Sequence, residues 1–460
     1  MKWLLYNILF TIAYLVMMPS FLLRMKRRGG YRARMGDRFA RYPADILSAF
    51  RAPSPSSTLG AQPRARSTSF IWLHAVSVGE VQVAGQLMRA LRAIDPSLRF
   101  VFSTTSSTGW RTAEREVTDR DVLIYNPLDF PFLVRRALDL IHPRAVILTE
   151  TEIWPNFIRE IRRRDIPLFL ANARISDRSA PRYRKLRWFF GETFRCFTKI
   201  YVQSDLDAER LAAAGADRAR MEVTGSFKFD VAKRRPEKES ELRAWIGEGR
   251  ILLGGSTWPG EDAALLRLCG DLPPDVKLVI APRHFEKADA VEANILKAGF
   301  RCIRRSRGDS PPNLLNPSTS QHPNPIYLAD TTGELMGLFG IASVAFVGKS
   351  LCAHGSQNMI EPCLCGVPTV VGPYTENFRP VMSDLLAADA IVQVKDEAEL
   401  RRTILSFFSA EGAQDAGALG ARAKAAVERR RGATARCATD ILSIVVNHGQ
   451  ALKSSACQGI

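Results

Sequence analysis

The sequence predicts an α/β protein with two doubly wound Rossmann-like domains and a hydrophobic helix at its N-terminus. Three observations support this fold class. Short β-rich apolar runs alternate with amphipathic helical stretches, which is typical of parallel sheets covered by helices on both faces. A charged segment at residues 233–239 interrupts the alternation near its midpoint, after which it starts again. At 460 residues, the chain is long enough for two such domains and an appendage.

The N-terminal segment, residues 1–23, is predicted to be a membrane anchor. The 21 residues from 3 to 23 carry no charge, and at about 1.5 Å per residue they reach roughly the 30 Å of a bilayer's hydrocarbon core. The alternative is a helix that lies on the membrane surface, which Asn7, Thr11 and Pro19 favour. Both interpretations place the protein at a membrane.

The next segment, residues 24–69, is strongly basic. Eleven Lys or Arg residues and two acidic residues between 24 and 66 supply +9 of the formal net charge of +17. A basic flank of this kind keeps its side of a membrane cytoplasmic. Within it, residues 52–68 are rich in Pro, Ser, Ala and Arg, so we expect an insertion or linker there.

The two domains follow in order. The first is predicted at residues 70–232, with strands at 70–74, 100–102, 122–125, 145–148, 168–170 and 200–202. The second is predicted at residues 245–407, with strands at 251–253, 278–280, 326–328, 344–347, 368–371 and 391–394. Residues 304–325 are expected to be an insertion, and residues 408–460 a helix and tail. Because ligands of such sheets bind beyond the carboxyl ends of the strands, we expect a site in a cleft between the domains.

Glu80 closes the run Ser-Val-Gly-Glu after the first predicted strand. Ser77 and Glu80 have the spacing of a capping box, in which both side chains satisfy amides of the first helical turn. A carboxylate at this edge of the sheet could instead act as a general base. The residues by themselves leave both interpretations open.

Three further charged residues are candidates in the first half of the chain. Glu150 and Glu152 follow another predicted strand, where their side chains would share one face. Glu152 could also complement the dipole of a helix start. Lys228 flanks the charged segment between the domains, where it could steady an anionic group, although a solvated lysine is the commoner case.

The second domain offers loops that could hold a phosphate. They follow predicted strands or open helices, and they lie at residues 254–257, 281–284, 330–335 and 355–362. Backbone amides and hydroxyl groups in such loops can cradle an anion. Cys and His residues between 352 and 365 lack the spacing of common zinc sites, so we predict no metal.

A series of motifs in this order resembles one family. The motifs are Ser-Val-Gly-Glu (77–80), Glu-Thr-Glu-Ile-Trp-Pro-Asn (150–156), Gly-Ser-Phe-Lys-Phe-Asp (225–230), Gly-Gly-Ser-Thr (254–257), Ala-Pro-Arg-His (281–284), Thr-Gly-Glu-Leu (332–335) and Asn-Met-Ile-Glu-Pro (358–362). Together with the anchor, the series resembles the 3-deoxy-D-manno-octulosonic acid (Kdo) transferases of lipopolysaccharide synthesis. The resemblance reaches to about Val394 and implies the GT-B fold, with the lipid A precursor bound by the first domain and CMP-Kdo by the second.

The resemblance also implies roles for particular residues. Glu80 corresponds to the catalytic base, and Glu150 and Lys228 correspond to positions that stabilise the transition state. The implied CMP contacts are Pro282, Arg283, Gly333, Glu334, Leu335, Asn358, Met359, Ile360 and Glu361. Two pairs depart from the family pattern: Ser-Gln at 356–357 stands where Gly-His is frequent, and Trp-Pro at 258–259 where His-Glu is common.

The function implied is an inverting transfer of Kdo from CMP-Kdo to the 6′-hydroxyl of a tetraacyl disaccharide 4′-phosphate lipid A precursor. The resemblance implies no metal cofactor and places the catalytic domains at the cytoplasmic face of the inner membrane, with anionic lipid as a partner. No nucleic-acid partner is expected, because the sequence shows no aromatic or helical readout elements. The alternatives are another GT-B enzyme, either a UDP-sugar transferase or an epimerase, and a non-enzymatic membrane-tethered protein that binds polyanions.

Overall fold

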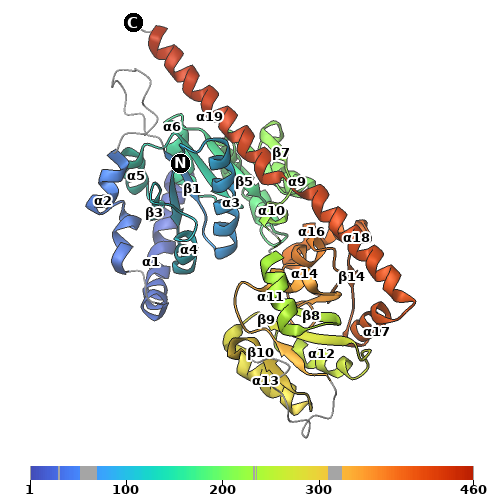
Figure 1. Ribbon diagram of the computed structural model, residues 1–460. Helices are drawn as coiled ribbons and strands as arrows, with labels where there is room; N and C mark the ends of the chain where they lie inside the picture. The colour runs from blue at the N-terminus through green and yellow to red at the C-terminus, as the bar shows by residue number, and fades with distance from the viewer. Residues whose placement is uncertain are drawn as a thin grey trace. The chain divides into compact units, whose positions relative to one another are not determined.

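Two parallel sheets carry the fold, and each belongs to a separate compact unit (Figure 1). The computed structural model describes residues 2–28, 32–51, 70–231, 234, 236–308 and 324–458. Unit 1 comprises Met1–Phe227 and Gly432–Ile460, and unit 2 comprises Lys228–Arg431. The predicted linker at 52–68 and most of the predicted insertion at 304–325 lie outside the described residues.

Unit 1 is built on a seven-stranded sheet in the order β3-β2-β1-β4-β5-β6-β7. Its strands are β1 (Phe70–His74), β2 (Arg99–Thr104), β3 (Val122–Tyr125), β4 (Ala145–Thr149), β5 (Leu168–Ala173), β6 (Lys199–Val202) and β7 (Met221–Val223). Every neighbouring pair is parallel. Successive residues of β1 enter different apolar cores, since Trp72 belongs to one core and its neighbours Ile71 and Leu73 to the other. Such alternation is what a sheet covered on both faces requires.

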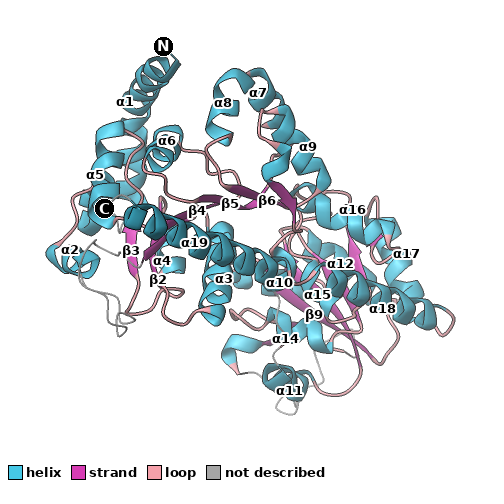
Figure 2. Ribbon diagram, turned by 90° about the horizontal axis from the view of Figure 1, so that it is seen from above, coloured by secondary structure: helices cyan, strands magenta, loops and turns pink. Residues whose placement is uncertain are grey.

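Helices cover both faces of this sheet (Figure 2). They are α1 (Lys2–Arg28), η1 (Arg32–Phe39), α2 (Ala44–Arg51), α3 (Val78–Ile94), α4 (Ser107–Ala113), α5 (Pro131–Ile141), α6 (Pro155–Arg163), α7 (Ala180–Lys185), α8 (Arg187–Phe194), α9 (Asp205–Ala213), η2 (Arg218–Arg220) and α19 (Ala433–Gln458). The C-terminal helix α19 packs on α3, and its Cys437 and Ile441 enter the same core as Leu87. The end of the chain therefore completes the unit in which the chain began.

Unit 2 repeats the design with strand order β10-β11-β9-β8-β12-β13-β14. Its strands are β8 (Arg250–Thr257), β9 (Val276–Pro282), β10 (Cys302–Arg304), β11 (Ile326–Leu328), β12 (Val344–Val347), β13 (Thr369–Val371) and β14 (Val392–Gln393). All pairs are again parallel. Its helices are α10 (Lys228–Val231), α11 (Pro236–Ile246), α12 (Glu261–Cys269), η3 (Phe285–Lys287), α13 (Ala288–Lys297), η4 (Arg305–Arg307), α14 (Leu335–Ile341), α15 (Ile360–Leu364), η7 (Glu376–Phe378), α16 (Arg379–Ala387), α17 (Glu397–Phe408) and α18 (Gly412–Arg430).

The N-terminal helix α1 packs one side against unit 1. The Trp3 and Tyr6 rings lie 5.5 and 5.4 Å from the Phe189 ring of α8, and Phe10 lies 5.2 Å from Phe130. On its other side, apolar side chains are exposed; they are Leu4, Leu5, Ile8, Leu9, Ile12, Leu15, Val16 and Met17. Within the described part of the chain, the segment Lys2–Ser20 is long and apolar enough to cross a membrane by length and composition.

Candidate active site

The order of the strands in unit 1 reverses between β1 and β4. β1 pairs with β2 on one side and with β4 on the other, and doubly wound sheets bind ligands where the order reverses. Glu80 lies in the first turn of α3, which follows β1, and Glu150 comes directly after β4. The two candidate carboxylates of unit 1 therefore lie at its topological switch point.

The Glu80 carboxylate is hydrogen-bonded at both oxygens. The Val76 N–H donates to Oε2 at 2.9 Å, and the Ser77 hydroxyl donates to Oε1 at 2.7 Å. The Glu80 N–H donates to Ser77 Oγ at 3.3 Å, which confirms the serine half of the predicted capping box. The glutamate half differs, because Glu80 accepts from the amide of Val76 and not from that of the N-cap residue Ser77. Glu80 is only half-buried, and a carboxylate can accept about four hydrogen bonds. Capping thus leaves room for another proton donor at Glu80.

Glu150 is buried and has a φ of 53°, which is uncommon for a residue other than glycine. Its N–H donates to the Ala171 carbonyl at 3.0 Å, which fixes the turn after β4 against β5. Its carboxylate accepts a hydrogen bond from Arg174 Nε at 2.9 Å, and the two side chains form an ion pair. Arg174 follows β5, so a third strand end contributes to the site.

The charges of Glu80 and Glu150 both act on the carboxyl group of Glu152. Burial raises the pKa of Glu152 to about 8; the negative charge of Glu80 adds to this rise, a hydrogen bond from Trp154 opposes it, and the charge of Glu150 adds further. The bond from Trp154 Nε1 to Glu152 Oε2 is 3.1 Å long. The structure therefore brings Glu80, Glu150 and Glu152 into one cluster, which we call the carboxylate cluster.

His74 is a residue near this cluster that sequence reasoning missed. It is fully buried at the end of β1, and its Nδ1 lies 3.1 Å from the Ser103 carbonyl oxygen. Nδ1 also lies 2.9 Å from the Ser103 hydroxyl, and burial lowers the pKa of His74 to about 4. Its ring packs against Trp154 at a centroid distance of 6.3 Å. The available signal was its place as the last residue of a strand, just before the Glu80 turn.

The corresponding point in unit 2 lies between β8 and β12, and a buried carboxylate organises it. Glu261 is fully buried and accepts hydrogen bonds from the N–H groups of Trp258 at 2.7 Å, Lys349 at 2.7 Å and Ser350 at 3.0 Å. It thereby joins the loop after β8 to the loop after β12. Sequence reasoning missed Glu261, which is the first residue of α12 and bonds to backbone amides.

Three of the predicted donor residues lie together in unit 2. Arg283 is exposed after β9, and its N–H donates to the Thr257 carbonyl at 3.0 Å. Burial raises the pKa of Glu361, whereas a hydrogen bond from Asn358 and the positive charge of Arg283 act in the opposite direction. The Asn358 amide donates to Glu361 Oε1 at 3.0 Å. The charge of Arg283 therefore links the segment at 281–284 electrostatically to Glu361 in the segment at 355–362.

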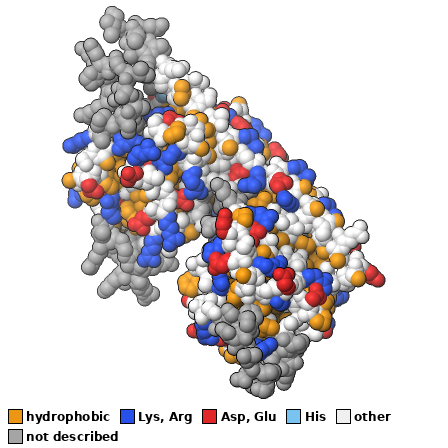
Figure 3. Space-filling model, viewed as in Figure 1, with side chains coloured by type: hydrophobic (Ala, Val, Ile, Leu, Met, Phe, Trp, Pro, Cys, Tyr) orange, Lys and Arg blue, Asp and Glu red, His pale blue; other side chains and the backbone are white. Residues whose placement is uncertain are grey.

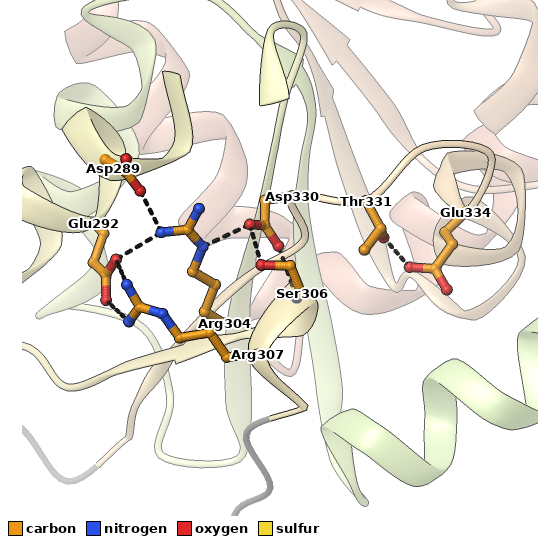
Figure 4. Close-up of polar contacts among 8 residues, drawn as sticks. All are labelled: Asp289, Glu292, Arg304, Ser306, Arg307, Asp330, Thr331 and Glu334. Carbon is orange, nitrogen blue, oxygen red and sulfur yellow. Dashed lines mark hydrogen bonds and ion pairs between the residues drawn. The ribbon is translucent and has the colours of Figure 1, made fainter. Parts of the chain in front are cut away.

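Glu334 makes protein contacts through its whole carboxylate. Arg305 donates to both oxygens at 3.3 and 3.1 Å, and the Thr331 hydroxyl also donates to the carboxylate. Figure 4 shows the Thr331 contact beside a network in which Arg304 contacts Asp330. These bonds hold the loop before α14 rather than leave the Glu334 side chain open to a ligand.

The other predicted donor residues differ in exposure. Gly333 has a φ of 84°, and a Cβ there would meet no atom within 4 Å, so its backbone borders open space. Leu335 is half-buried against an apolar core, and Met359 and Ile360 are fully buried. The side chains of these three residues pack in the protein interior, so mainly their backbone atoms are available to contact a ligand.

A cavity of about 100 Å³ lies beyond β8 and β9 and includes Pro282 in its wall. The pair Trp258 and Pro259, which departs from the family pattern, also lines it. The Trp258 ring lies 5.0 Å from His284 and 5.0 Å from Lys349 Nζ. The two residues that depart from the family pattern therefore line this cavity.

Lys228 is the first residue of unit 2, and its Nζ lies 4.9 Å from the centre of the Phe378 ring. The contact is a cation–π interaction, which fixes the ammonium group beside η7. Among the side chains that the structure describes, no group of three or more His, Cys, Asp or Glu residues is placed to hold a metal ion.

Comparison with known proteins shows the family. Residues 33–231 match the model of the 3-deoxy-D-manno-octulosonic-acid transferase (kdotransferase) family. The chain is 35% identical to a 3-deoxy-D-manno-octulosonic acid transferase of Bordetella pertussis, over 75% of this chain and 81% of the relative. It is 33% identical to the enzyme of the same name from Haemophilus influenzae, over 75% of this chain and 80% of the relative. The chain belongs to the Kdo transferase family.

Solved structures extend the comparison to the fold. The Kdo transferase resembles a UDP-GlcNAc 2-epimerase from Neisseria meningitidis, with a TM-score of 0.55 and 13% identity over 82% of this chain and 99% of the other. A glycosyltransferase from Rickettsia africae gives a TM-score of 0.54 at 13% identity, over 82% of this chain and 98% of the other. These likenesses confirm a GT-B-like fold.

Membership of the Kdo transferase family makes the protein a glycosyltransferase of lipopolysaccharide synthesis. The enzyme is thereby favoured over a non-enzymatic polyanion-binding protein and over an epimerase. The part of the chain matched by the family model contains Glu80, Glu150 and Lys228, whereas Arg283 and Glu361 lie beyond it.

Proposed function

We propose that this Kdo transferase moves Kdo from CMP-Kdo to the 6′-hydroxyl of a tetraacyl disaccharide 4′-phosphate lipid A precursor, with inversion at the anomeric carbon. The observation that carries the proposal is the carboxylate cluster at the switch point of unit 1. In the transfer, the acceptor oxygen bonds to the anomeric carbon, and the bond from that carbon to the phosphate oxygen breaks. CMP leaves with the electron pair of that bond, and Glu80 takes the hydroxyl proton.

Glu80 is suited to the role of base because its carboxylate is fixed by Val76 and Ser77 but remains partly exposed. A buried carboxylate close to the reacting centre, Glu150, would stabilise positive charge that develops on the sugar. Lys228 would stabilise the negative charge that develops on the departing phosphate, since an ammonium group acts there as a point charge. Side chains of this protein supply all three roles.

Unit 2 is proposed to bind the donor. Arg283 is exposed and can form charged hydrogen bonds with the phosphate. Glu361 and Asn358, which are hydrogen-bonded to each other, can bind the ribose hydroxyls, and the charge of Arg283 acts on the Glu361 carboxylate. The open backbone at Gly333 allows a close approach of the nucleotide.

The acceptor is amphipathic and anionic, so the enzyme must work beside a membrane. We propose that α1 attaches the protein to the cytoplasmic face of the inner membrane. Trp3 donates to Glu192 at 3.1 Å, Tyr6 donates to Asp129 at 2.8 Å and Asn156 donates to Asn7 at 2.7 Å. Because these bonds dock the first turns of α1 on unit 1, they favour the surface helix over the spanning helix, with the exposed apolar side meeting lipid.

A basic and aromatic surface lies next to this helix. The exposed basic side chains are Arg178, Arg182, Arg184, Lys185 and Arg187, in and around α7, followed by exposed Trp188. Basic side chains are not confined to this surface, since Figure 3 shows Lys and Arg side chains gathered on another face of unit 1. Near an anionic bilayer each well-placed basic residue contributes about 1 kcal/mol. Replacing Arg182, Arg184 and Lys185 together by Gln should reduce sedimentation with anionic vesicles and leave sedimentation with neutral vesicles unaltered.

The proposed reaction is tested by incubating the purified full chain with CMP-Kdo and the tetraacyl disaccharide. The expected product has the mass of the acceptor plus one or more Kdo residues, and its anomeric configuration, read by NMR, is opposite to that of the donor. Product formation from a UDP-sugar but not from CMP-Kdo would show that the proposed donor is wrong. Transfer with retained configuration would contradict the proposed mechanism and leave the substrates standing.

A further inference from the structure

The side of α1 that faces unit 1 is polar and aromatic. Its contacts with unit 1 recur every three or four residues, at Trp3, Tyr6, Phe10 and Tyr14, and Asn7 lies on the same side. This is the spacing of one helix face. Attachment to lipid does not require a hydroxyl and an amide there, because an unbonded polar group costs free energy in an apolar medium. Tyr6 and Asn7 therefore indicate a specific contact with unit 1.

Tyr6 bonds to a carboxylate that holds the start of α6. The Asp129 side chain is buried, and its Oδ2 accepts from the Tyr6 hydroxyl at 2.8 Å and from the Asn156 N–H at 3.0 Å. Its Oδ1 accepts from the Phe157 N–H at 2.8 Å. The N-cap residue of α6 is Trp154, whose indole N–H can only donate. Asp129 therefore satisfies amides that a helix start leaves without intrahelical partners.

Asn7 bonds to the same turn of α6. The buried Asn156 amide donates to Asn7 Oδ1 at 2.7 Å and to the Asp129 carbonyl at 2.5 Å. Both N–H groups of that side chain are then used, so the loss of Asn7 would leave one of them without this partner in a buried position, which is costly. Two adjacent residues of α1 thus converge on one turn of unit 1.

That turn lies at the end of the loop that carries Glu150. Glu150 comes directly after β4, and Trp154 comes directly before α6, so the sheet fixes one end of the loop and α6 fixes the other. Trp154 also packs against His74 at the end of β1 and donates to Glu152. A shift of the first turn of α6 would therefore move the loop and its two carboxylates.

We propose that Tyr6 and Asn7 are positioning residues for the transfer, which act through Asp129 and Asn156 on the loop that carries Glu150. The helix α1 then has two tasks, because it meets lipid on one side and holds part of the active site on the other. This inference rests on the proposed function, since it assumes that Glu150 acts in the transfer. Unit 2 is proposed to bind CMP, so loss of these contacts should slow transfer and leave CMP binding unaltered.

The test is the double variant Tyr6→Phe/Asn7→Ala in the full chain. Phenylalanine keeps the ring that stacks on Phe189 and loses only the hydroxyl. The assay uses saturating CMP-Kdo and tetraacyl disaccharide in detergent micelles, where attachment to a bilayer does not limit the rate. We expect kcat to fall about tenfold, because a misplacement of about 1 Å can cost about 100-fold. Calorimetry with CMP and sedimentation with anionic vesicles should give wild-type results.

The matched control is Glu192→Gln in α8. Glu192 pairs with Lys2 and accepts from Trp3, so this variant weakens the docking of α1 but removes no bond to Asp129 or Asn156. It should keep the wild-type kcat. Tyr6→Phe alone removes a single bond and should give a kcat between those of the wild type and the double variant, which keeps the test possible if the double variant folds poorly.

Amide hydrogen exchange provides a second measurement, which does not depend on activity. The N–H groups of Asn156 and Phe157 should exchange about tenfold faster in the double variant, because the start of α6 opens more often. In Glu192→Gln they should exchange at the wild-type rate. Unaltered exchange in the double variant, faster exchange with a wild-type kcat, or an equal loss of kcat in Glu192→Gln would overturn the inference. Absence of Kdo transfer by the wild type would instead overturn the proposed function, and the exchange rates would still decide whether α1 holds the start of α6.

Discussion

The carboxylates at the strand-end edges of the two units have different partners. In unit 1, the charges of Glu80 and Glu150 both act on Glu152, and Arg174 pairs with Glu150. In unit 2, each buried carboxylate has its own partners. Glu261 accepts from backbone amides, Asp330 pairs with Arg304 and Glu334 pairs with Arg305.

This difference indicates two kinds of chemistry. A cluster of carboxylates with little compensation holds protons and can accept one from a substrate, as general bases do. In unit 2, where Asp330 and Glu334 pair with other arginines, Arg283 is exposed and can meet a phosphate. Both sheets reverse their strand order beside the first strand, although in unit 2 β11 lies between β9 and β10. The difference therefore lies in the residues placed at the two switch points.

The largest effect is expected from Glu80→Gln, which tests whether the unit 1 edge removes a proton. Glutamine keeps the shape and part of the hydrogen bonding of the carboxylate, but it cannot accept a proton. We expect transfer to slow by about 10² to 10⁴-fold, which corresponds to about 3 to 5 kcal/mol in the barrier. Single-turnover rates at saturating CMP-Kdo measure this loss.

A control variant must distinguish the loss of a helix cap from the loss of a catalytic base in Glu80→Gln. Glu399→Gln removes a carboxylate from an equivalent capping position in unit 2 and should cost about 1 kcal/mol of stability or less. Both variants should melt within a few degrees of the wild type. Equal slowing of the two variants would mean that Glu80 acts only as a cap.

The next largest effect concerns the unit 2 edge. Arg283→Ala should weaken CMP binding about 10 to 100-fold, because a charged hydrogen bond is worth about 1.5 to 3 kcal/mol. Isothermal calorimetry with CMP measures the change. Arg401→Ala, which breaks the exposed pair with Asp271, should leave CMP affinity as it is. Should Arg283→Ala bind CMP normally, the assignment of phosphate binding to this edge would fail.

The strands show what the sequence could predict of the fold. Each predicted strand overlaps a strand of the structure. The two that were missed, β7 at Met221–Val223 and β10 at Cys302–Arg304, are three residues long and lie at sheet edges. An edge strand is half exposed and needs no continuous apolar run. The sequence also could not predict that α19 packs against unit 1. An amphipathic pattern shows that a helix has a buried face, but it does not show which element covers that face.

The site shows a similar limit. Strand-end positions were enough to select Glu80, Glu150 and Arg283 as candidates. They could not show that Glu80 and Glu150 follow neighbouring strands, because β1 lies next to β4 and these are not consecutive strands. The sequence analysis did not find Glu261, because its partners are backbone amides. Almost every residue supplies such an amide, so no sequence pattern marks the contact.

The smallest expected effect tests whether neutralised carboxylates of unit 2 act only by holding loops. Arg305 pairs with buried Glu334 and with exposed Glu241, so one cation offers a matched comparison. Glu334→Gln should cost about 1 kcal/mol of stability, since a buried charged bond is weakened. Glu241→Gln should leave stability almost unaltered, because its ion pair is exposed to solvent. Urea unfolding measures both. CMP affinity should fall only about two- to fivefold in Glu334→Gln, because the loop at Gly333 loosens while no ligand contact is removed. A loss in CMP affinity as large as that of Arg283→Ala, with stability unaltered, would mean that the Glu334 carboxylate touches the nucleotide, and the contrast between the two edges would no longer hold.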